Sequence, residues 1–282
     1  MSKFFSFGEH ELDLAEIQVM GVLNVTPDSF SDGGQFSTLS SAMNRAEQMI
    51  LQGAGIIDVG GESTRPGAAR VSVQEEMDRV CPVVERLVAN FDTVISVDTS
   101  TPELMGESIR LGAGLINDVR AFSREGAVNA VKGGSAALCV MHMQGVPVSM
   151  QKAPSYNAVV DEVCDFLQSS AAQMIAQGID SRRLLVDPGF GFGKTLQHNM
   201  QILSAIGRFT QLGFPVLVGL SRKSMFSEIL NKPIDERLFG SLSGAVIAAY
   251  QGAKIIRAHD VSETKDAMRV IDAMNRCAKL TE

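Results

Sequence analysis

Short apolar segments recur along the whole chain, and within each segment the apolar residues are continuous rather than alternating. Continuous runs of valine, isoleucine and leucine are typical of strands buried on both faces, as in a parallel sheet. We therefore predict eight parallel strands, at Gln18–Leu23, Ile56–Val59, Val94–Val97, Gly114–Ile116, Ala137–Met141, Leu184–Val186, Val216–Val218 and Lys254–Arg257.

Helical patterns fill the intervals between these strands. Eight strands that alternate with helices over 282 residues are typical of a closed (β/α)8 TIM barrel, an α/β fold, rather than an open sheet. We expect one barrel domain over residues 1–282, with an N-terminal β-hairpin, Phe4–Phe7 and Leu12–Leu14, that plugs the barrel floor. Apolar residues spaced by three and four positions predict helices at Ser40–Gln52, Gln74–Asn90, Asn157–Gln177 and Glu236–Gln251.

Composition and charge narrow the function classes. A hydrophobic fraction of 45% and a charged fraction of 20% are typical of a globular domain and argue against a disordered chain. The net charge is −7, with no long basic block, so we expect no binding to nucleic acid or to an anionic membrane by bulk attraction. Small molecules remain as the expected partners, and an anionic one would need local cationic groups.

The cysteines and the apolar stretches favour a cytoplasmic protein. The N-terminal residues lack the pattern of a signal peptide. The longest stretch without Asp, Glu, Lys or Arg, Gly133–Gln151, contains polar residues and several glycines, which argues against a membrane span. Four cysteines without CxxC spacing are expected to be buried and reduced: Cys81, Cys139, Cys164 and Cys277.

A polar or charged residue follows every predicted strand. One such residue alone is more often a turn former or a helix cap than a catalyst. In a (β/α)8 barrel, however, the active site lies at the carboxyl ends of the strands, so a polar group at all eight ends predicts an active site there. The groups are Asn24, Asp58, Asp98, Asn117-Asp118, His142, Asp187, Ser221-Arg222-Lys223, and Arg257 with His259.

The residue types at these ends suggest their ligands. Asp98, Asn117 and Asp187 offer hydrogen-bond acceptors that suit a flat heterocycle with adjacent N–H donors, and Phe192 offers a ring that packs on a ligand ring. Ser221 and the residues after it open a predicted helix, whose free N–H groups suit a second anion such as a carboxylate. The cationic groups that suit phosphate oxygens are Arg65, Lys223, Arg257 and His259.

Two glycine-containing loops follow the first two strands, at 26–34 and 60–67. We expect both to close over substrate and to exclude water. Neither loop matches GxGxxG or GxxxxGK[ST], which argues against a dinucleotide site and a P-loop.

Several long motifs resemble those of the dihydropteroate synthase family, in order and over essentially the whole chain. They are MGVLNVTPDSFSDGG at 20–34, GGESTRPG at 60–67, DPGFGFGK at 187–194, SRKS at 221–224 and RAHD at 257–260. The resemblance implies a transferase of folate biosynthesis that joins 6-hydroxymethyl-7,8-dihydropterin diphosphate to 4-aminobenzoate. Ala258 and Phe226 depart from the family pattern without removing a functional group.

The resemblance also implies roles for individual residues and a homodimer. Asp98, Asn117, Asp187 and Lys223 would hold the pterin, and Asn24 would ligate Mg²⁺ on the diphosphate. Ser221, Phe192 and the two loops, with Phe30 and Pro66, would form the aminobenzoate side, where sulfonamides compete. The phosphates would be bound by Thr64, Arg65, His259 and Arg257, of which Arg257 would also stack on the pterin.

Simple chemistry agrees with these roles. When diphosphate leaves a CH₂ group attached to an electron-rich pterin, the developing cation is stabilised by Asp98 and Asp187, and Mg²⁺ with the cationic groups stabilises the departing charge. We therefore expect Asp98, Asp187, Lys223 and Arg257 to be catalytic. An arylamine is already nucleophilic, so we assign no strong general base and no covalent nucleophile.

Two alternatives share the pterin site. A corrinoid-type pterin-binding methyltransferase domain would not need the Thr64–Gly67 segment or the Ser221–Lys223 anion site, and no corrinoid-binding motif is evident. A non-catalytic pterin-binding paralogue is disfavoured because four residues are intact, namely Asn24, Arg65, Lys223 and Arg257.

Overall fold

Eight parallel strands form a barrel in the computed structural model, which describes residues 4–25, 35–62, 71–145, 150–151 and 153–278. The strands are neighbours in the order β8-β7-β6-β5-β4-β3-β10-β9. A parallel bridge between Val186 and Val216 closes the ring, and the N–H of Val186 donates to the Pro215 carbonyl at 3.0 Å. All eight predicted strands are confirmed, as β3 (Gln18–Asn24), β4 (Ile56–Gly60), β5 (Val94–Asp98), β6 (Leu115–Asp118), β7 (Ala137–Met141), β8 (Leu184–Asp187), β9 (Leu217–Gly219) and β10 (Ile255–Ala258).

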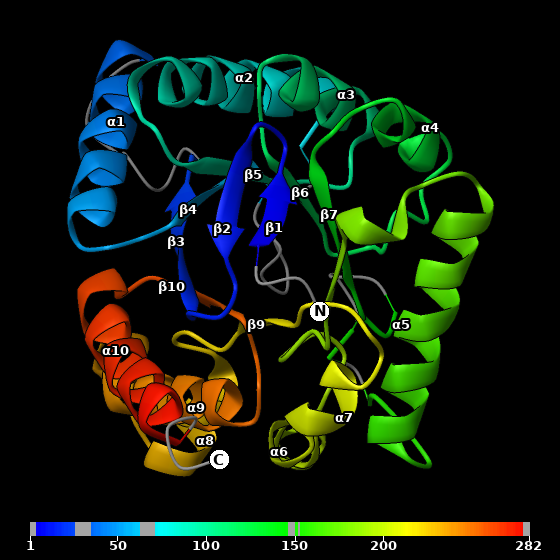
Figure 1. Cartoon of the computed structure of the whole chain (residues 1–282), viewed down its shortest axis with the longest axis vertical. Coiled ribbons are helices and arrows are strands. Elements are labelled where there is room, and N and C mark those ends of the chain that lie inside the picture. The colour runs from blue at the N-terminus through cyan, green and yellow to red at the C-terminus, as the bar shows by residue number, and fades with distance from the viewer. Residues whose placement is uncertain (1–3, 26–34, 63–70, 146–149, 152, 279–282) are drawn as a thin grey trace.

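Helices surround the strands, as the view along the barrel shows (Figure 1). The four predicted helices are confirmed with ends within five residues, as α1 (Gln35–Leu51), α2 (Val73–Asn90), α5 (Val159–Ala176) and α9 (Leu238–Tyr250). The others are α3 (Pro102–Arg110), α4 (Ala127–Lys132), α6 (Leu196–Ser204), α7 (Ile206–Thr210), α8 (Ser224–Leu230) and α10 (Val261–Ala278), with two 3₁₀ turns at Ser181–Arg183 and Ile234–Glu236.

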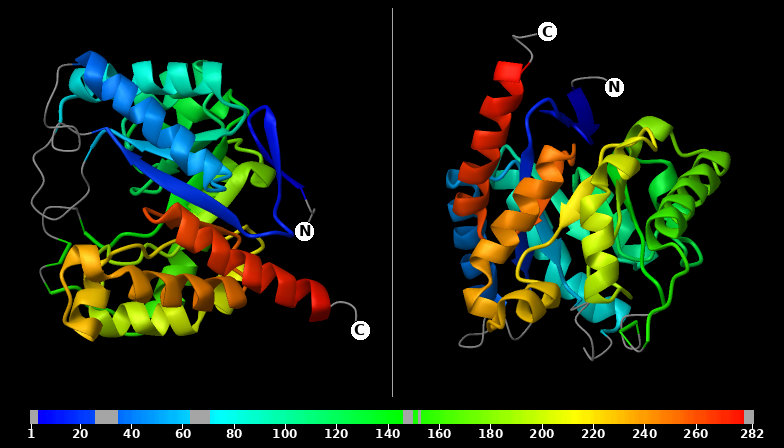
Figure 2. Two further views of the ribbon diagram at one scale, coloured as in Figure 1. Left: turned by 90° about the vertical axis from the view of Figure 1, so that its left-hand side faces the viewer. Right: turned by 90° about the horizontal axis from the view of Figure 1, so that it is seen from below.

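The core has two layers. The larger layer fills the space between the strands and the helices, and the smaller one fills the amino-terminal half of the barrel interior. The hairpin β1 (Phe4–Phe7) and β2 (His10–Asp13) inserts the fully buried Phe7 into this smaller layer. Figure 2 shows the hairpin at the end of the barrel where α10 also finishes. The floor is therefore plugged as predicted. We call this smaller layer the floor layer. Its members besides Phe7 are Leu14, Met20, Ile56, Val94, Leu115, Ala137, Cys139, Leu185, Leu217 and Ile255.

All four cysteines are free thiols. Cys139 and Cys164 are buried, as expected, and Cys81 is half-buried, whereas Cys277 is exposed, and for that residue the prediction of burial was wrong. Cys277 lies in the last turn of α10, beyond the helices that pack over the barrel. In the part of the chain that the structure describes, no helix is both long and apolar enough to cross a membrane.

Candidate active site

The strand register brings the predicted polar residues to one rim of the barrel. Asn24 pairs with Gly60, Gly60 with Asp98, and Asp98 with Asn117, so the three polar residues lie at one level of four consecutive strands, with Gly60 between the first two. A Cβ at Gly60 would lie 3.6 Å from Oδ1 of Asn24 and 3.8 Å from Cβ of Asp98. The missing side chain at Gly60 leaves space between these two polar residues.

Arg257 at the end of β10 forms two ion pairs across the barrel mouth. Its Nε donates to Oδ2 of Asp58 at 2.6 Å, and its Nη2 donates to Oδ2 of Asp98 at 3.0 Å. Asp58 is fully buried and also accepts a hydrogen bond from the Ser96 hydroxyl at 2.6 Å. Burial opposes the charge of Arg257, but Asp58 and Asp98 outweigh it and raise the pKa of the guanidinium. Arg257 is therefore a permanent cation at the rim.

Shielding from water is the largest influence on the pKa of three other charged groups at the rim. It raises the pKa of Asp98 to about 7, against the opposing effect of Arg257. It also raises the pKa of Asp187, against the opposing effect of Lys223. The same cause lowers the pKa of Lys223 to about 8, although Asp187 acts in the other direction. Groups whose pKa values are moved towards neutrality by burial are typical of functional sites.

Lys223 is held between β8 and β9. Its Nζ donates to the Phe190 carbonyl and lies 4.6 Å from the centre of the Phe192 ring, within cation–π range. Lys223 caps α8, and the preceding Arg222 has φ +58° and is ion-paired with Asp260. Residues 221–223 therefore form a turn ahead of α8 rather than its first helical turn, because a left-handed residue interrupts the helical path.

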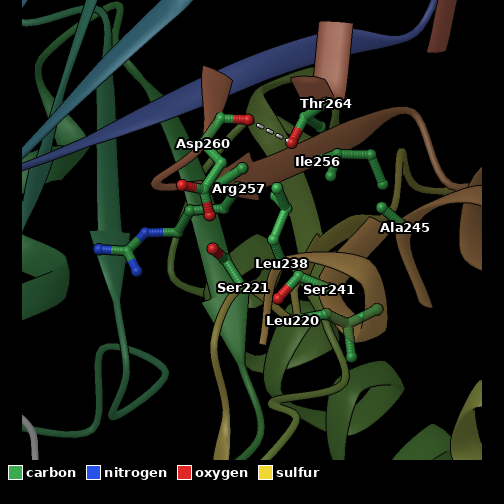
Figure 3. Close-up of a pocket in the computed structure, with 10 residues that line it drawn as sticks. Leu220, Ser221, Leu238, Ser241, Ala245, Ile256, Arg257, Asp260 and Thr264 are labelled. Atoms are coloured by element: carbon green, nitrogen blue, oxygen red, sulfur yellow. Dashed lines mark hydrogen bonds between the residues drawn. The ribbon is translucent and has the colours of Figure 1, made fainter. Parts of the chain in front are cut away.

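Ser221 and His259 contact each other beside this turn. The His259 N–H donates to the Ser221 hydroxyl oxygen at 3.1 Å, and Nδ1 of His259 lies 2.9 Å from the same oxygen. Figure 3 shows Ser221 here, with the Arg257 guanidinium extending away from it. The two predicted anion-binding residues thus lie side by side, on the carboxyl sides of β9 and β10.

Asn117 is the most informative residue of the site. It is 4% exposed, and among the residues that the structure describes its Oδ1 has no hydrogen-bond partner. A buried acceptor without a donor costs about 1–3 kcal/mol, so such an atom needs an explanation. It lies next to Asp98, and a ligand with adjacent N–H donors would satisfy both residues.

The structure therefore brings most of the predicted site residues to one rim, while Phe30, Thr64, Arg65 and Pro66 lie outside the described residues. From the sequence we included Asp58 among the polar strand ends but gave it no individual role, although a charged residue inside the apolar run of β4 is itself a signal of function. His142 lies behind the rim, with its Nδ1 2.8 Å from Nζ of Lys194. The predicted site residues that lie together at the rim are Asn24, Asp98, Asn117, Asp187, Phe192, Ser221, Lys223, Arg257 and His259.

Comparison with known proteins identifies the family. The model of the family described as "Pterin binding enzyme" matches residues 20–259. A dihydropteroate synthase of Escherichia coli K12 is 54% identical over 271 residues, which is 96% of each chain. One from Haemophilus influenzae is 50% identical over 93% of this chain and 95% of its own.

Solved structures agree with these matches. A Yersinia pestis dihydropteroate synthase in a sulfonamide drug complex superposes with a TM-score of 0.93 at 49% identity, covering 97% of this chain and 99% of its own. A Xanthomonas albilineans enzyme with 7,8-dihydropteroate superposes with a TM-score of 0.88 at 42% identity, covering 96% and 98%. The X. albilineans enzyme with 4-aminobenzoic acid gives a TM-score of 0.92 at 44% identity, covering 98% and 99%. From these matches and from the rim of polar strand ends, the chain belongs to the pterin binding enzyme family.

Proposed function

We propose that the chain acts as a dihydropteroate synthase. It transfers the pterinylmethyl group of 6-hydroxymethyl-7,8-dihydropterin diphosphate to the amine of 4-aminobenzoate, and releases 7,8-dihydropteroate and diphosphate in folate biosynthesis. The observation that carries this proposal is the buried, unpartnered Oδ1 of Asn117 beside Asp98, which leaves an acceptor for an N–H donor of the ligand. The relatives of 50–54% identity are synthases that catalyse this reaction.

The rim residues divide the chemistry between them. Asp98, Asn117 and Asp187 accept hydrogen bonds from the pterin, and Lys223 donates to it. As the bond between the methylene carbon and the diphosphate oxygen breaks, the carboxylates of Asp98 and Asp187 stabilise the positive charge on the pterin. The amine nitrogen then forms the new carbon–nitrogen bond and loses a proton, so no protein nucleophile is required.

The opposite charge develops on the leaving group. Arg257 and His259, at the carboxyl end of β10, would bind the diphosphate oxygens together with Thr64 and Arg65 of the family motif. Ser221 and Phe192 lie at the proposed aminobenzoate side. We propose that sulfonamides compete with 4-aminobenzoate there, which the sulfonamide complex of the Y. pestis relative supports.

Asn24 is our proposed protein ligand for Mg²⁺. The described residues contain no group of three or more His, Cys, Asp or Glu side chains that would form a complete metal cage. The side-chain oxygen of Asn24 is a donor of the kind that Mg²⁺ prefers, so Asn24 would hold the ion at the rim. Bound there, Mg²⁺ would neutralise charge on the departing diphosphate. Removal of Mg²⁺ with EDTA should abolish turnover, and Asn24→Ala should raise the Mg²⁺ concentration needed for half-maximal rate.

A homodimer and a cytoplasmic location are further parts of the proposal. The dimer rests on the family resemblance and on a row of exposed apolar side chains on α9 and α10, and light scattering of the purified chain would test it. The location rests on the free thiols. The exposed side chains are Phe239, Ile247 and Tyr250 on α9, with Val270 and Met274 on α10.

The deciding experiment measures diphosphate release with both substrates and Mg²⁺. Release that requires 4-aminobenzoate, with 7,8-dihydropteroate as product, supports the synthase. Pterin binding without any release would favour the non-catalytic paralogue, and methyl transfer from a methylated pterin would favour the methyltransferase.

A pair of variants tests the observation at Asn117. Asn117→Leu removes the acceptor and should abolish measurable pterin binding without loss of stability, because it also removes an unsatisfied buried atom. Ser108→Ala is the matched control, since the Ser108 hydroxyl on α3 is likewise buried without a hydrogen-bond partner in the described chain. Ser108→Ala should leave kcat and both KM values unchanged. Wild-type pterin affinity in Asn117→Leu would overturn the assignment.

A further inference from the structure

The loop between β8 and α6, residues 188–194, packs against residues 142–144 almost backbone on backbone. The His142 N–H donates to the Asp187 carbonyl at 3.0 Å. Gly189 has φ +70°, and a Cβ there would lie 1.9 Å from the His142 carbonyl oxygen. Gly193 has φ +61°, and a Cβ there would lie 2.4 Å from the Gln144 carbonyl oxygen. The position of the loop against residues 142–144 is therefore tightly constrained by backbone contacts that only glycine allows at 189 and 193.

Lys194 holds this loop from behind. Its side chain is buried, and its Nζ lies 2.8 Å from Nδ1 of His142 and donates to the carbonyls of Gly189 at 2.9 Å and Phe192 at 3.1 Å. A fourth, longer contact reaches the His142 carbonyl at 3.4 Å. The amino group thus meets a ring nitrogen and two carbonyls rather than a carboxylate, and burial lowers the pKa of Lys194 well below its ordinary value. A buried ammonium is costly, and packing alone would be served better by an apolar side chain.

His142 completes the arrangement. Its ring is buried, and it meets the Phe166 ring edge-on at 4.9 Å. Burial and the neighbouring Lys194 lower the pKa of His142 to about 3, so the imidazole is neutral at physiological pH. Nδ1 of His142 and Nζ of Lys194 therefore share one hydrogen bond across this contact.

The same loop supports two groups of the proposed pterin site. Asp187 opens the loop and accepts the Gly189 N–H at 2.7 Å. The Phe190 carbonyl accepts a hydrogen bond from Lys223, and the Phe192 ring makes a cation–π contact with the same ammonium. The carbonyls that Lys194 binds belong to Gly189 and Phe192, so they flank the Phe190 carbonyl along the chain.

We propose that Lys194 and His142 form a buried positioning pair that fixes the loop after β8, so that Asp187 and Lys223 face the pterin. Neither residue touches the substrate; both act through the loop. The inference rests on the proposed function, since it names the pterin as the ligand that the positioned groups hold.

Lys194→Met tests the pair, because methionine keeps much of the length of the side chain and removes its donors. We expect the Kd for the pterin diphosphate, measured with Mg²⁺ and without 4-aminobenzoate, to rise about 10- to 100-fold, since small misplacements of binding groups have effects of this size. His142→Leu should raise the same Kd about tenfold, whereas His142→Asn, whose amide oxygen can take the place of Nδ1, should stay within about threefold of wild type.

Arg183→Met is the matched control. Arg183 is another cation that donates to backbone carbonyls, those of Ala136 and Val131, but it lies just before the amino end of β8. The Arg183→Met substitution should lower the Tm without changing the Kd for the pterin diphosphate.

The outcomes separate the two ideas. A wild-type chain that binds the pterin diphosphate but shows no aminobenzoate-dependent release overturns the proposed function, while the binding measurements still decide on the pair. Wild-type affinity in Lys194→Met overturns the pair. If Lys194→Met does not fold, the two His142 variants decide: equal affinities for Leu and Asn at this position overturn the proposal, and rescue by Asn supports it.

Discussion

Asp98, Lys223 and Arg257 at the rim are each half-buried beside a group of opposite charge, and shielding from water is the stronger influence on the pKa of Asp98 and Lys223. Asp98 shares Arg257 with Asp58, yet its pKa still rises to about 7 because it is removed from water. Lys223 lies near Asp187, yet its pKa falls to about 8. These values place one titration near neutral pH and the other about one unit above it.

The first prediction is a narrow pH profile for kcat/KM of the pterin diphosphate. Asp98 must be ionised to accept N–H donors, so activity should rise as pH passes through about 7. Lys223 must be protonated to donate, so activity should fall as pH passes through about 8. Initial rates at low substrate concentration between pH 5 and 10 test this. A flat profile would contradict these roles.

The second prediction concerns the stability of Asp98→Asn. Asp98 has an ordinary pKa of 3.8 when unfolded and about 7 when folded, so the folded state binds more protons between these values, and stability falls as pH rises through them. The neutral amide removes this cost. We expect the Tm of Asp98→Asn at pH 8 to exceed that of wild type by about 2–4 °C, the shift that roughly 1 kcal/mol produces. The gain should vanish towards pH 4, while activity is lost at every pH.

The sequence predicted the residue types of the site better than their contacts. Asp98, Asn117 and Asp187 stand at recognisable strand ends, so the barrel rule alone placed them at one rim. The Arg257–Asp58 pair joins residues 199 positions apart, and no local pattern indicates it. The missing partner of Asn117 depends on how neighbouring strands and loops pack, and that too is not encoded in spacing.

Between elements, a buried carboxylate ties α2 to the turn after β5. Glu76 in the first turn of α2 is 3% exposed and accepts hydrogen bonds from the hydroxyls of Thr99 at 2.7 Å and Thr101 at 2.6 Å. Thr99 directly follows Asp98. The helix therefore fixes the path of the chain as it leaves the pterin side of the rim.

The third prediction follows from this tie. Glu76→Leu would leave two buried hydroxyls without their acceptor, at about 1–3 kcal/mol each, so we expect a loss of about 2–6 kcal/mol in the free energy of unfolding. Glu76→Gln keeps one acceptor and should lose less. Urea denaturation measures both, and equal stability of the two variants would argue against the tie.

Phe226 shows how a departure from the family pattern is accommodated. The ring on α8 lies over two glycines of α9, where a Cβ at Gly240 or at Gly244 would come within 2.9 Å of ring atoms. The bulkier residue thus occupies space that the glycines leave open. This explains why it leaves the turn with Lys223 intact.

At the scale of the whole molecule, stability and function lie at opposite ends of the barrel. The hairpin and the floor layer close the amino-terminal end, and the polar rim occupies the other. This division was predictable from the order of elements, because the barrel fold fixes which end holds the loops that follow the strands. Thr64, Arg65, Phe30 and Pro66 remain predictions from the motif.

The fourth prediction uses this division. Phe7→Ala empties the centre of the floor layer, and deletion of a buried phenylalanine costs about 3–5 kcal/mol. We expect a large fall in Tm with both KM values unchanged at a temperature where the variant is folded. Weaker pterin binding in the folded variant would mean that the two ends are coupled.

The single bridge between β8 and β9 has a consequence for motion. The other neighbouring strands share continuous ladders, so this seam is where the barrel should open most readily. Asp187 ends β8 and Lys223 follows β9, so a pterin bound by both residues would link the two strands across this seam. Hydrogen exchange of the Val186 amide should therefore slow on binding the pterin diphosphate, while that of Ile57 in the β3–β4 ladder should not change. Binding of the substrate would then stabilise the part of the barrel with the fewest hydrogen bonds between strands.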